Sequence, residues 1–581
     1  MIVKKHFNII IIITLLIVSL FLGTAIDYIK GIYSKEIVKK VDFDEKVDFS
    51  ERGINEDDSV YENDMPIELS SVYITVANES EGNTDIGLDK PLTFDILNGL
   101  RSRITLNSTL NFDAIFQEGN ELGPQKGMFG YTDSVPNCTI ELRGQSTIDA
   151  VQKSYKIRLY DDTGLWKDMK IINLNKHAWD MTRVRNKLSF DYFKIIPDMF
   201  SLRTNFVKVY VKDLSGGNKK AGFVEYGLFT QIEQPNKAFL SSHGLDPNGS
   251  LYKANNFEFF RYSNVILNQN DKNYNKTEFE KILEIKSTNN NEKLIEMLDA
   301  VNNYSKNIND IVDKHFDRAN LFTWLAINIL MGNIDTRTQN YLLYSPNNSD
   351  KWYLGPWDYD AAWDWENQTG VTPKLKASWE FGIANFWGSV LFNRLLKDTD
   401  NQKQLTDKII EIGKIINKEN TRKLIDSYYP LVSPIIAIPP DISGIQGSIE
   451  NFKTEYRRLE TIPDQNLKRF HESLEYPMPF YLGGIQNIKG QYSLHWEQSY
   501  DFQRDDIKYD LTLATDPDFK NVIINAPNLV STVYKIKNIT PGTYYWKVTV
   551  SDKKGNTQQA FDIYTDNFGK EYFGISQLII N

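Results

Sequence analysis

The chain of 581 residues is too long for one hydrophobic core, so two or three domains are expected. A hydrophobic content of 41% and a charged content of 24% are those of a folded protein and exclude disorder over most of the length. A formal net charge of −10 provides no basic field for phosphate backbones, which excludes nucleic acid as the main partner. The single cysteine, Cys138, excludes an intrachain disulfide and a cysteine-rich zinc site.

The first 26 residues are expected to lie outside the folded domains. Lys4 and Lys5 precede an uncharged run of 19 residues, 8–26, which is nearer to a membrane-spanning helix than to the shorter apolar region of a secretory signal. We therefore predict a signal anchor over 1–26 that contacts the membrane, with a cleaved signal peptide as the alternative. The charge-rich residues 27–66 are typical of a spacer. The main body is expected to be extracytoplasmic.

Strand and helix patterns mix between residues 67 and about 475. Short β-rich runs predict strands at 70–77, 138–144, 153–160, 204–213 and 221–233, after which the chain is predicted to turn helical. Helical spacing predicts helices at 182–196 and 317–332, the second with Asp317 as N-cap and one apolar face at Leu321, Leu325, Ala326 and Ile329. The predicted fold class is α+β.

The tail from about residue 480 has a different pattern. Short alternating strands are separated by Pro, Gly, Asn and Asp turns, which predicts an all-β sandwich of about 100 residues. The stretch "ITPGTYYWKVTVSDKKGN" (539–556) and Trp496 resemble a fibronectin type III domain. That resemblance implies a spacer or binding module over 480–581, with no catalytic residue.

Polar residues surround a short apolar hairpin in "GNIDTRTQNYLLYSPNNSDKWYLGPWDYDAAWDWE" (332–366). Phosphoryl transfer needs a carboxylate near the acceptor hydroxyl, oxygen ligands for magnesium and a cation on the phosphates. Asp335 and Asn340 stand five apart, and Asp358 follows the hairpin, in the order in which protein kinases present these groups. The motif therefore predicts a magnesium-nucleotide site.

Two other interpretations of this stretch stay open. In the first, Asp335 caps a turn, Asn340 takes a left-handed conformation and Asp358 ends a strand, all without chemistry. In the second, the chain is a glycosidase with carboxylates at Asp358, Asp360, Asp364 and Glu366 and sugar platforms at Trp357, Trp363 and Trp365. The glycosidase interpretation leaves Asp335 and Asn340 without roles.

A kinase-like site also requires a lysine on an upstream strand. Lys153 shares strand parity with Tyr155, Ile157 and Leu159, which places it on the apolar side, where an ammonium needs an anionic partner. Lys153 is therefore the predicted phosphate ligand, and a strand-end lysine reaching solvent is the alternative. The preceding "LRGQST" turn offers further phosphate contacts at Arg143, Gly144 and Ser146.

Four segments together resemble the spore coat protein H (CotH) kinase family. They are "ELRGQSTIDAVQKSYKIRLY", "INLNKHAWDMTRVRNKLSFDYF", "NIDTRTQNYLLY" and "GPWDYDAAW", which follow the family's order within about 67–475. The resemblance implies an atypical protein kinase-like domain with two lobes, which binds ATP with magnesium. It further implies phosphorylation of Ser or Thr in protein substrates, at the cell surface or on the spore coat.

The resemblance also implies roles for single residues. Asp335 matches the catalytic aspartate, Lys153 the lysine of the K-S-Y motif, and Asn340, Asp358 and Asp360 the magnesium ligands. Arg185 and Asn186 begin the R-N-K-L helix and either contact phosphate, cap the helix or brace the core. Glu233 lies near the expected lobe junction, and its role is open. Asp364 departs from the usual family glycine, and we expect Asp364 and Glu366 at the rim. A non-catalytic surface scaffold with the same fold is the rival hypothesis.

Overall fold

The structure is a computed structural model that describes residues 54, 56–62, 64, 69–79, 92–101, 110–217, 221–288, 291–373, 375–488, 491–536 and 539–580. The predicted signal anchor at 1–26 and most of the predicted spacer lie outside these residues. Within the described part of the chain, no helix is both long and apolar enough to cross a membrane.

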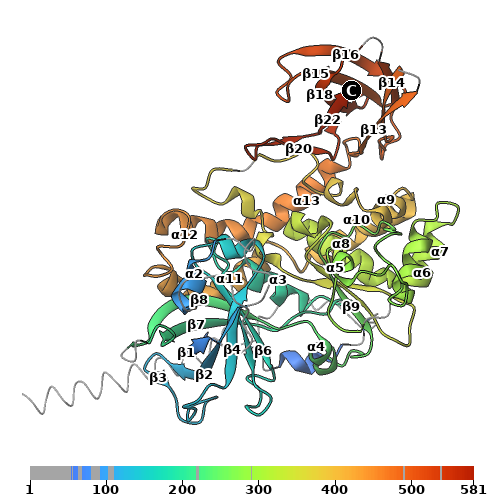
Figure 1. The fold of residues 1–581 in the computed structure, drawn as a ribbon. Helices are drawn as coiled ribbons and strands as arrows, with labels where there is room; N and C mark the ends of the chain where they lie inside the picture. The colour runs from blue at the N-terminus through green and yellow to red at the C-terminus, as the bar shows by residue number, and fades with distance from the viewer. Residues whose placement is uncertain are drawn as a thin grey trace, which may run out of the picture.

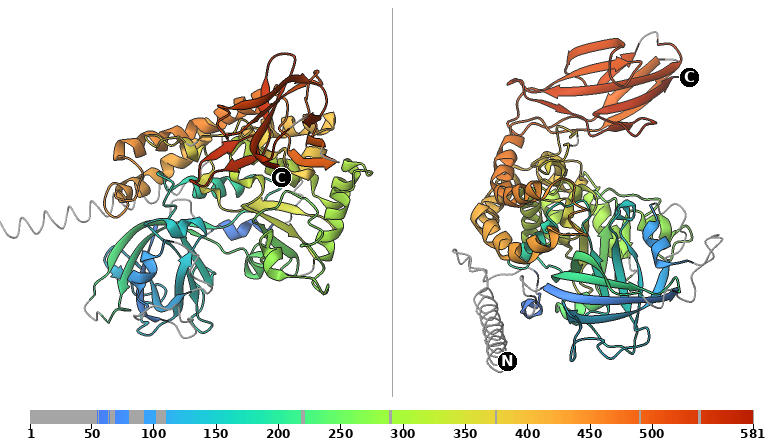
Figure 2. Two further views of the ribbon diagram at one scale, coloured as in Figure 1. Left: turned by 45° about the horizontal axis from the view of Figure 1, so that its top comes forward. Right: turned by 90° about the vertical axis from the view of Figure 1, so that its left-hand side faces the viewer.

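An eight-stranded sheet dominates the N-terminal half (Figures 1 and 2). Its order is β1-β7-β8-β6-β5-β4-β2-β3, and because β1 also pairs with β2, the strands form a closed ring with β3 appended. Side chains such as Phe112, Phe116, Tyr155 and Trp166 form its hydrophobic core. The strands are β1 Leu69–Glu79, β2 Asn111–Asn120, β3 Gly123–Pro124, β4 Cys138–Arg143, β5 Ser154–Leu159, β6 Ile171–Asn175, β7 Thr204–Asp213 and β8 Val224–Ile232.

The strands predicted in this half are confirmed as β1, β4, β5, β7 and β8. The helix predicted over 182–196 is confirmed as α3, but it runs only over Arg185–Phe193. Arg183 has a φ of 60°, a left-handed conformation that a right-handed helix does not accept. The carboxylate of Asp180 accepts the main-chain N–H of Arg185, the first helical residue, at 3.1 Å, and so satisfies a donor that has no partner within the helix.

Helices and a smaller sheet build the second half, which packs around α8 (Arg318–Met331). Asp317 is its N-cap, as predicted, and accepts the N–H of Asn320 at 2.8 Å. The predicted apolar face at Leu321, Leu325, Ala326 and Ile329 is buried, and burial extends to every residue from Asn320 to Met331 in the centre of this half. The other helices are α2 Phe94–Gly99, α4 Lys237–Ser242, α5 Lys276–Glu280, α6 Glu292–Val301, α7 Ile308–His315, α9 Val390–Leu395, α10 Thr399–Gly413, α11 Lys418–Ile436, α12 Ile449–Arg458 and α13 Ile462–Ser473.

The smaller sheet has the order β10-β9-β11-β12. Its strands are β9 Ser250–Ala254, β10 Leu283–Ile285, β11 Tyr341–Ser345 and β12 Tyr353–Pro356. The predicted hairpin is confirmed as β11–β12. Helices dominate after residue 233, as predicted, but β9 and β10 were not predicted. These two strands are too short to show an alternating pattern and are strands only through pairing with each other and with the hairpin.

The C-terminal β region, residues 480–580, is all-β as predicted and lies apart from the N-terminal sheet (Figure 1). One sheet has the order β13-β14-β17 and the other β16-β15-β18-β19, with β22 also on β18. Trp496 and Trp546 are buried in the core between them. The strands are β13 Leu482–Ile488, β14 Gln491–Trp496, β15 Lys508–Ala514, β16 Val522–Leu529, β17 Val533–Ile536, β18 Gly542–Ser551, β19 Thr557–Gln559, β20 Ile563–Thr565, β21 Glu571–Phe573 and β22 Ile575–Ile580.

A buried ion cluster ties the short segment before β1 to the rest of the fold. His243 Nδ1 lies 2.6 Å from Glu56 and its Nε2 lies 2.9 Å from Glu233, which also accepts from Arg203 at 2.7 Å. Burial alone would lower the pKa of His243, but hydrogen bonds to Glu233 and Glu56 raise it to about 9. Burial raises the pKa of Glu56, whereas His243 and Arg203 overcome burial and lower the pKa of Glu233 to about 2.

This cluster predicts a stability loss at alkaline pH. A histidine whose folded pKa is raised contributes stability that is complete below pH 6.5 and is lost as the pH rises through about 9, here up to about 3 kcal/mol. Urea denaturation from pH 6.5 to 9.5 should show this fall, and His243→Gln should flatten it. His471→Gln, at an exposed histidine of α13, is the matched control and should leave the slope unchanged. Equal slopes in wild type and His243→Gln would contradict the assignment.

Candidate functional site

The hairpin brings the predicted acidic residues to one end of the smaller sheet. Asp335 lies in a short 3₁₀ turn, Ile334–Arg337, that follows α8, and Asn340 lies directly before β11. Asp358 lies just past the end of β12. Asn340 and Asp358 have φ of 58° and 57°, so the chain turns sharply where it enters the hairpin and where it leaves it. The register pairs Tyr341 with Pro356, which places both turns at the same end.

Two amides orient the carboxylate of Asp335. Gln339 Nε2 donates to one oxygen at 3.0 Å, and Asn340 Nδ2 donates to the other at 3.0 Å. Because the amide nitrogen of Asn340 is engaged with Asp335, its Oδ1 is the atom available to a cation. The spacing of five residues therefore allows a direct hydrogen bond between the side chains of Asn340 and Asp335.

The carboxylates are held together against their mutual repulsion. Burial raises the pKa of Asp335, and the charges of Asp360 and Glu366 raise it further. Burial and the charge of Asp360 raise the pKa of Asp358 to about 6, despite opposing effects of Arg143 and Lys253. Groups that repel each other in this way gain most from a cation placed between them.

The donor set fits magnesium bound together with a phosphate ester. Among the described residues, no three His, Cys, Asp or Glu side chains are grouped closely enough to hold a metal ion by themselves. Magnesium commonly uses only one or two carboxylates and completes its shell with water and phosphate oxygens. Asp358, Asp360 and the amide oxygen of Asn340 are ligands of that kind.

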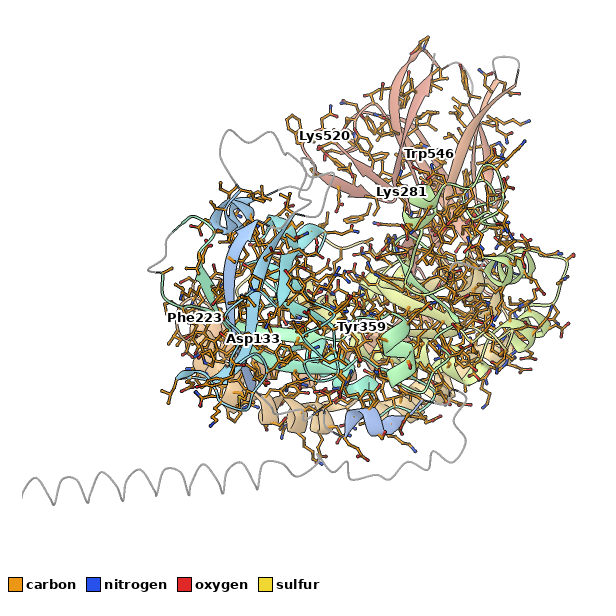
Figure 3. All side chains as sticks on the ribbon, turned by 60° about the horizontal axis from the view of Figure 1, so that its bottom comes forward. Asp133, Phe223, Lys281, Tyr359, Lys520 and Trp546 are labelled. Carbon is orange, nitrogen blue, oxygen red and sulfur yellow. The ribbon has the colours of Figure 1, made fainter. Side chains whose placement is uncertain are left out.

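His177 and Asn186 support the turn that carries these carboxylates. His177 Nδ1 lies 3.1 Å from Asp360 Oδ2, and its Nε2 lies 3.3 Å from Asn186 Nδ2. Asn186 Oδ1 accepts the main-chain N–H of Tyr359 at 3.1 Å, and Tyr359 is fully buried where the N-terminal sheet meets the helices (Figure 3). Sequence reasoning missed His177, because a single histidine in "NKHAWD" forms no ligand pattern.

Cations reach the carboxylates from both sheets. Arg143 ends β4, and Lys253 lies in β9. Burial lowers the pKa of both side chains, while Asp358 raises the pKa of each. Arg143 and Lys286 also lie over the ring of Trp357, at 5.4 Å and 6.0 Å from its centroid. Sequence reasoning predicted Arg143 but missed Lys253 in β9 and Lys286 directly after β10, because these two strands were not recognised.

The "LRGQST" turn depends on its glycine. Gly144 has a φ of 104°, and a Cβ there would lie 1.7 Å from Thr147 Oγ1, so no other residue fits without rearrangement. Ser146 begins the following 3₁₀ turn and is exposed. The turn therefore sets the direction in which the main chain leaves β4 after Arg143.

Lys153 is buried, as its strand parity predicted, with 3% of its surface exposed. Its ammonium donates to the main-chain oxygens of Leu100 and Ile148, which take the place of the anionic partner that we expected. Burial and the charge of Arg101 lower the pKa of Lys153 to about 8. Its role as the phosphate ligand stays a prediction.

Arg185 and Glu233 lie in buried ion pairs. Arg185 is fully buried and binds Asp180 and Glu455, which joins α3 to α12. Glu233 is paired with Arg203 and His243 in the cluster described above. Both residues therefore stabilise the fold. The charge of Arg185 is already neutralised by carboxylates and that of Glu233 by cations, so neither charge is left for a ligand.

The predicted rim position is wrong for Asp364, which is 9% exposed. Its carboxylate pairs with Lys376 at 3.2 Å and with Arg458 at 2.8 Å, so local cations neutralise it. Glu366 also contacts Lys376, at 3.3 Å. Asp364 therefore stabilises the loop beyond the hairpin.

Carboxylates, an amide oxygen and cations gathered at one end of a hairpin are suited to hold a metal-bound phosphate ester. The family model described as CotH kinase protein matches residues 140–469, more than half of the chain. The chain belongs to this family, and the resemblance seen in the four sequence segments is confirmed. The inner spore coat protein H of Bacillus subtilis (strain 168) is similar, with 27% identity over 227 residues. The aligned part is 39% of this chain and spans 58% of that relative.

Replacing Asp358 should stabilise the protein in the absence of ligands. Because the folded pKa of Asp358 is raised, its ionisation lowers the free energy of unfolding of the protein as the pH rises from about 4 through about 6. Asp358→Asn removes this ionisation and should raise the free energy of unfolding above pH 6, by on the order of 1–2 kcal/mol for a partly exposed group. The two proteins should be equally stable near pH 3.5. Chemical denaturation at pH 3.5 and 7.5 measures this, and a less stable variant at pH 7.5 would contradict it.

Proposed function

We propose that the protein is an ATP- and magnesium-dependent kinase that phosphorylates Ser or Thr of spore coat or surface proteins. The observation that carries this proposal is the set of Asp335, Asn340 and Asp358 at one end of the hairpin, which are the groups that phosphoryl transfer needs in the order found in protein kinases. Family membership supports the same chemistry. The similar spore coat protein supports a location on the spore surface.

Each group at the hairpin has a role in the proposed mechanism. Asp335, fixed by Gln339 and Asn340, orients the acceptor hydroxyl and takes its proton. Asp358, Asp360 and Asn340 would hold magnesium, which neutralises charge on the phosphates when bound. Arg143 and Lys253 bind phosphate oxygens from opposite sheets, and Lys153 is the alternative phosphate ligand.

The glycosidase alternative has less support. A sugar platform requires an exposed aromatic face, but Trp363 is 0% exposed and Trp357 is 7% exposed. Asp364, one of the carboxylates in that alternative, is neutralised by Lys376 and Arg458. The scaffold alternative predicts no nucleotide binding, and the experiments below address it.

We further propose that the C-terminal β region is a fibronectin type III-like domain. Its two sheets, β13-β14-β17 and β16-β15-β18-β19 with β22 also on β18, support this assignment. So does the hydroxyl of Tyr544 near the start of β18, which donates to the main-chain oxygen of Thr540 at 2.8 Å, a contact typical of sandwich corners. The predicted membrane anchor remains a proposal for residues 1–26.

Removing the acidic groups should strongly slow phosphate transfer without unfolding the protein. Asp335→Asn and Asp358→Asn should each lower kcat for transfer of labelled phosphate from ATP to coat proteins by roughly 10²–10⁴-fold, because they remove the proton acceptor and a metal ligand. Asp350→Asn, at an exposed aspartate in the loop of the same hairpin, is the matched control and should keep full activity. Unchanged transfer in Asp358→Asn would rule out the site.

Calorimetry with ATP and magnesium distinguishes the candidate phosphate ligands. Lys253→Met should weaken nucleotide binding by about 10-fold or more. It removes an ammonium that lies close enough to Asp358 to feel its charge and that would bind a phosphate oxygen there. Lys153→Met tests the prediction from strand parity in the same way. An effect of Lys153→Met alone would show that Lys153 moves from its main-chain partners when nucleotide binds. Absence of binding by wild type would favour the scaffold.

A further inference from the structure

The C-terminal β region places one loop against the half of the molecule that carries Asp335. This loop, 560–562, joins β19 to β20, and β20 lies on the side of the region that faces the helices (Figure 1). The main-chain oxygen of Ala560 accepts the indole N–H of Trp379 at 3.1 Å. The ring of Phe561 lies 5.1 Å from that of Trp379.

Phe561 belongs to the hydrophobic core of the helical half and not to the core of its own region. It is 6% exposed, and it belongs to the group of buried side chains that pack around α8. The ring of Tyr481, at the start of the C-terminal β region, lies 4.9 Å from the ring of Phe561. A side chain buried in this way indicates a fixed docking contact and not a flexible connection.

Trp379 continues this contact to the turn that carries Asp335. It is 1% exposed, and the guanidinium of Arg337 lies over its ring, 4.5 Å from the centroid. Arg337 is the last residue of the 3₁₀ turn and stands two positions after Asp335. Phe561, Trp379 and Arg337 therefore form a continuous chain of contacts from the C-terminal β region to the candidate catalytic turn.

The charges around Arg337 favour this arrangement. Burial lowers the pKa of Arg337, and Tyr481, Glu380 and Asp335 act in the opposite direction. A half-buried guanidinium gains from an aromatic face as well as from anions. If Trp379 shifted, Arg337 would lose its contact with the aromatic ring, and the last residue of the turn would no longer be held in place.

We propose that the C-terminal β region is a positioning part of the catalytic domain, which fixes the turn of Asp335 through Phe561, Trp379 and Arg337. The spacer role expected for such a region would need none of these contacts. The physical coupling stands on geometry alone, whereas its consequence for phosphate transfer rests on the proposed function. Arg337 and Trp379 are positioning residues, because they act through the orientation of Asp335.

Hydrogen exchange of the full chain tests the coupling without any activity. Phe561→Ala should speed exchange of the amides of 332–340 at least about 3-fold, because the turn loses its support. The matched control is Phe568→Ala, which changes a phenylalanine of the same region that is 96% exposed and should have no effect. Unchanged exchange at 332–340 in folded Phe561→Ala would overturn the proposal.

A variant at the opposite end of this chain of contacts covers the case in which Phe561→Ala fails to fold. Arg337→Gln leaves the C-terminal β region untouched, and it should raise exchange over the same amides without lowering the melting temperature of the C-terminal β region. Arg337→Lys, which keeps the cation over Trp379, should restore most of the protection. Normal exchange in Arg337→Gln would also overturn the proposal.

Kinetics then test the consequence for catalysis. Phe561→Ala and Arg337→Gln should lower kcat between about 10-fold and 10²-fold, with KM for ATP unchanged, because only the orientation of Asp335 changes. An equal loss in kcat and in ATP affinity would indicate general destabilisation and overturn the positioning role. If wild type transfers no phosphate, the proposed kinase function fails, while the exchange experiment still decides the coupling.

Discussion

The antiparallel pairing of β11 with β12 is the constraint on which the candidate site depends. With Tyr341 opposite Pro356, residues that precede one strand and follow the other must lie at the same end of the hairpin. Asp335, Asn340 and Asp358 meet there for this reason, although they span 24 positions of the chain. The left-handed backbone at Asn340 and Asp358 completes the two sharp turns.

Gathering these carboxylates lowers the stability of the protein, and contacts in the surrounding structure hold them in place despite their repulsion. The buried α8 and its left-handed Gly332 deliver Asp335, while His177 and Asn186 hold the turn of Asp360 from the N-terminal half. Buried pairs such as Arg185 with Glu455 join the two halves of the molecule. A site whose groups repel each other when empty can bind a cation with high selectivity for charge.

The sequence was informative where the signal is local. The hairpin, its flanking residues and the long helix before them follow from short-range patterns, and so do most strands of both β regions. The sequence was misleading where the decisive contact is distant. β9 carries Lys253 and is a strand only because it pairs with β10 and β11. The burial of Asp364 depends on Arg458, 94 positions later in the chain.

By itself, the sequence determined the α+β class, the family segments and the order of Asp335, Asn340 and Asp358, because these depend on residue type and on spacing along the chain. Only the tertiary structure decided which cations face the carboxylates, that main-chain oxygens hold the ammonium of Lys153, and that Phe561 packs into the helical core. The physical reason is that burial and electrostatic fields are set by neighbours in space, and these neighbours come from strands and loops far apart in the chain.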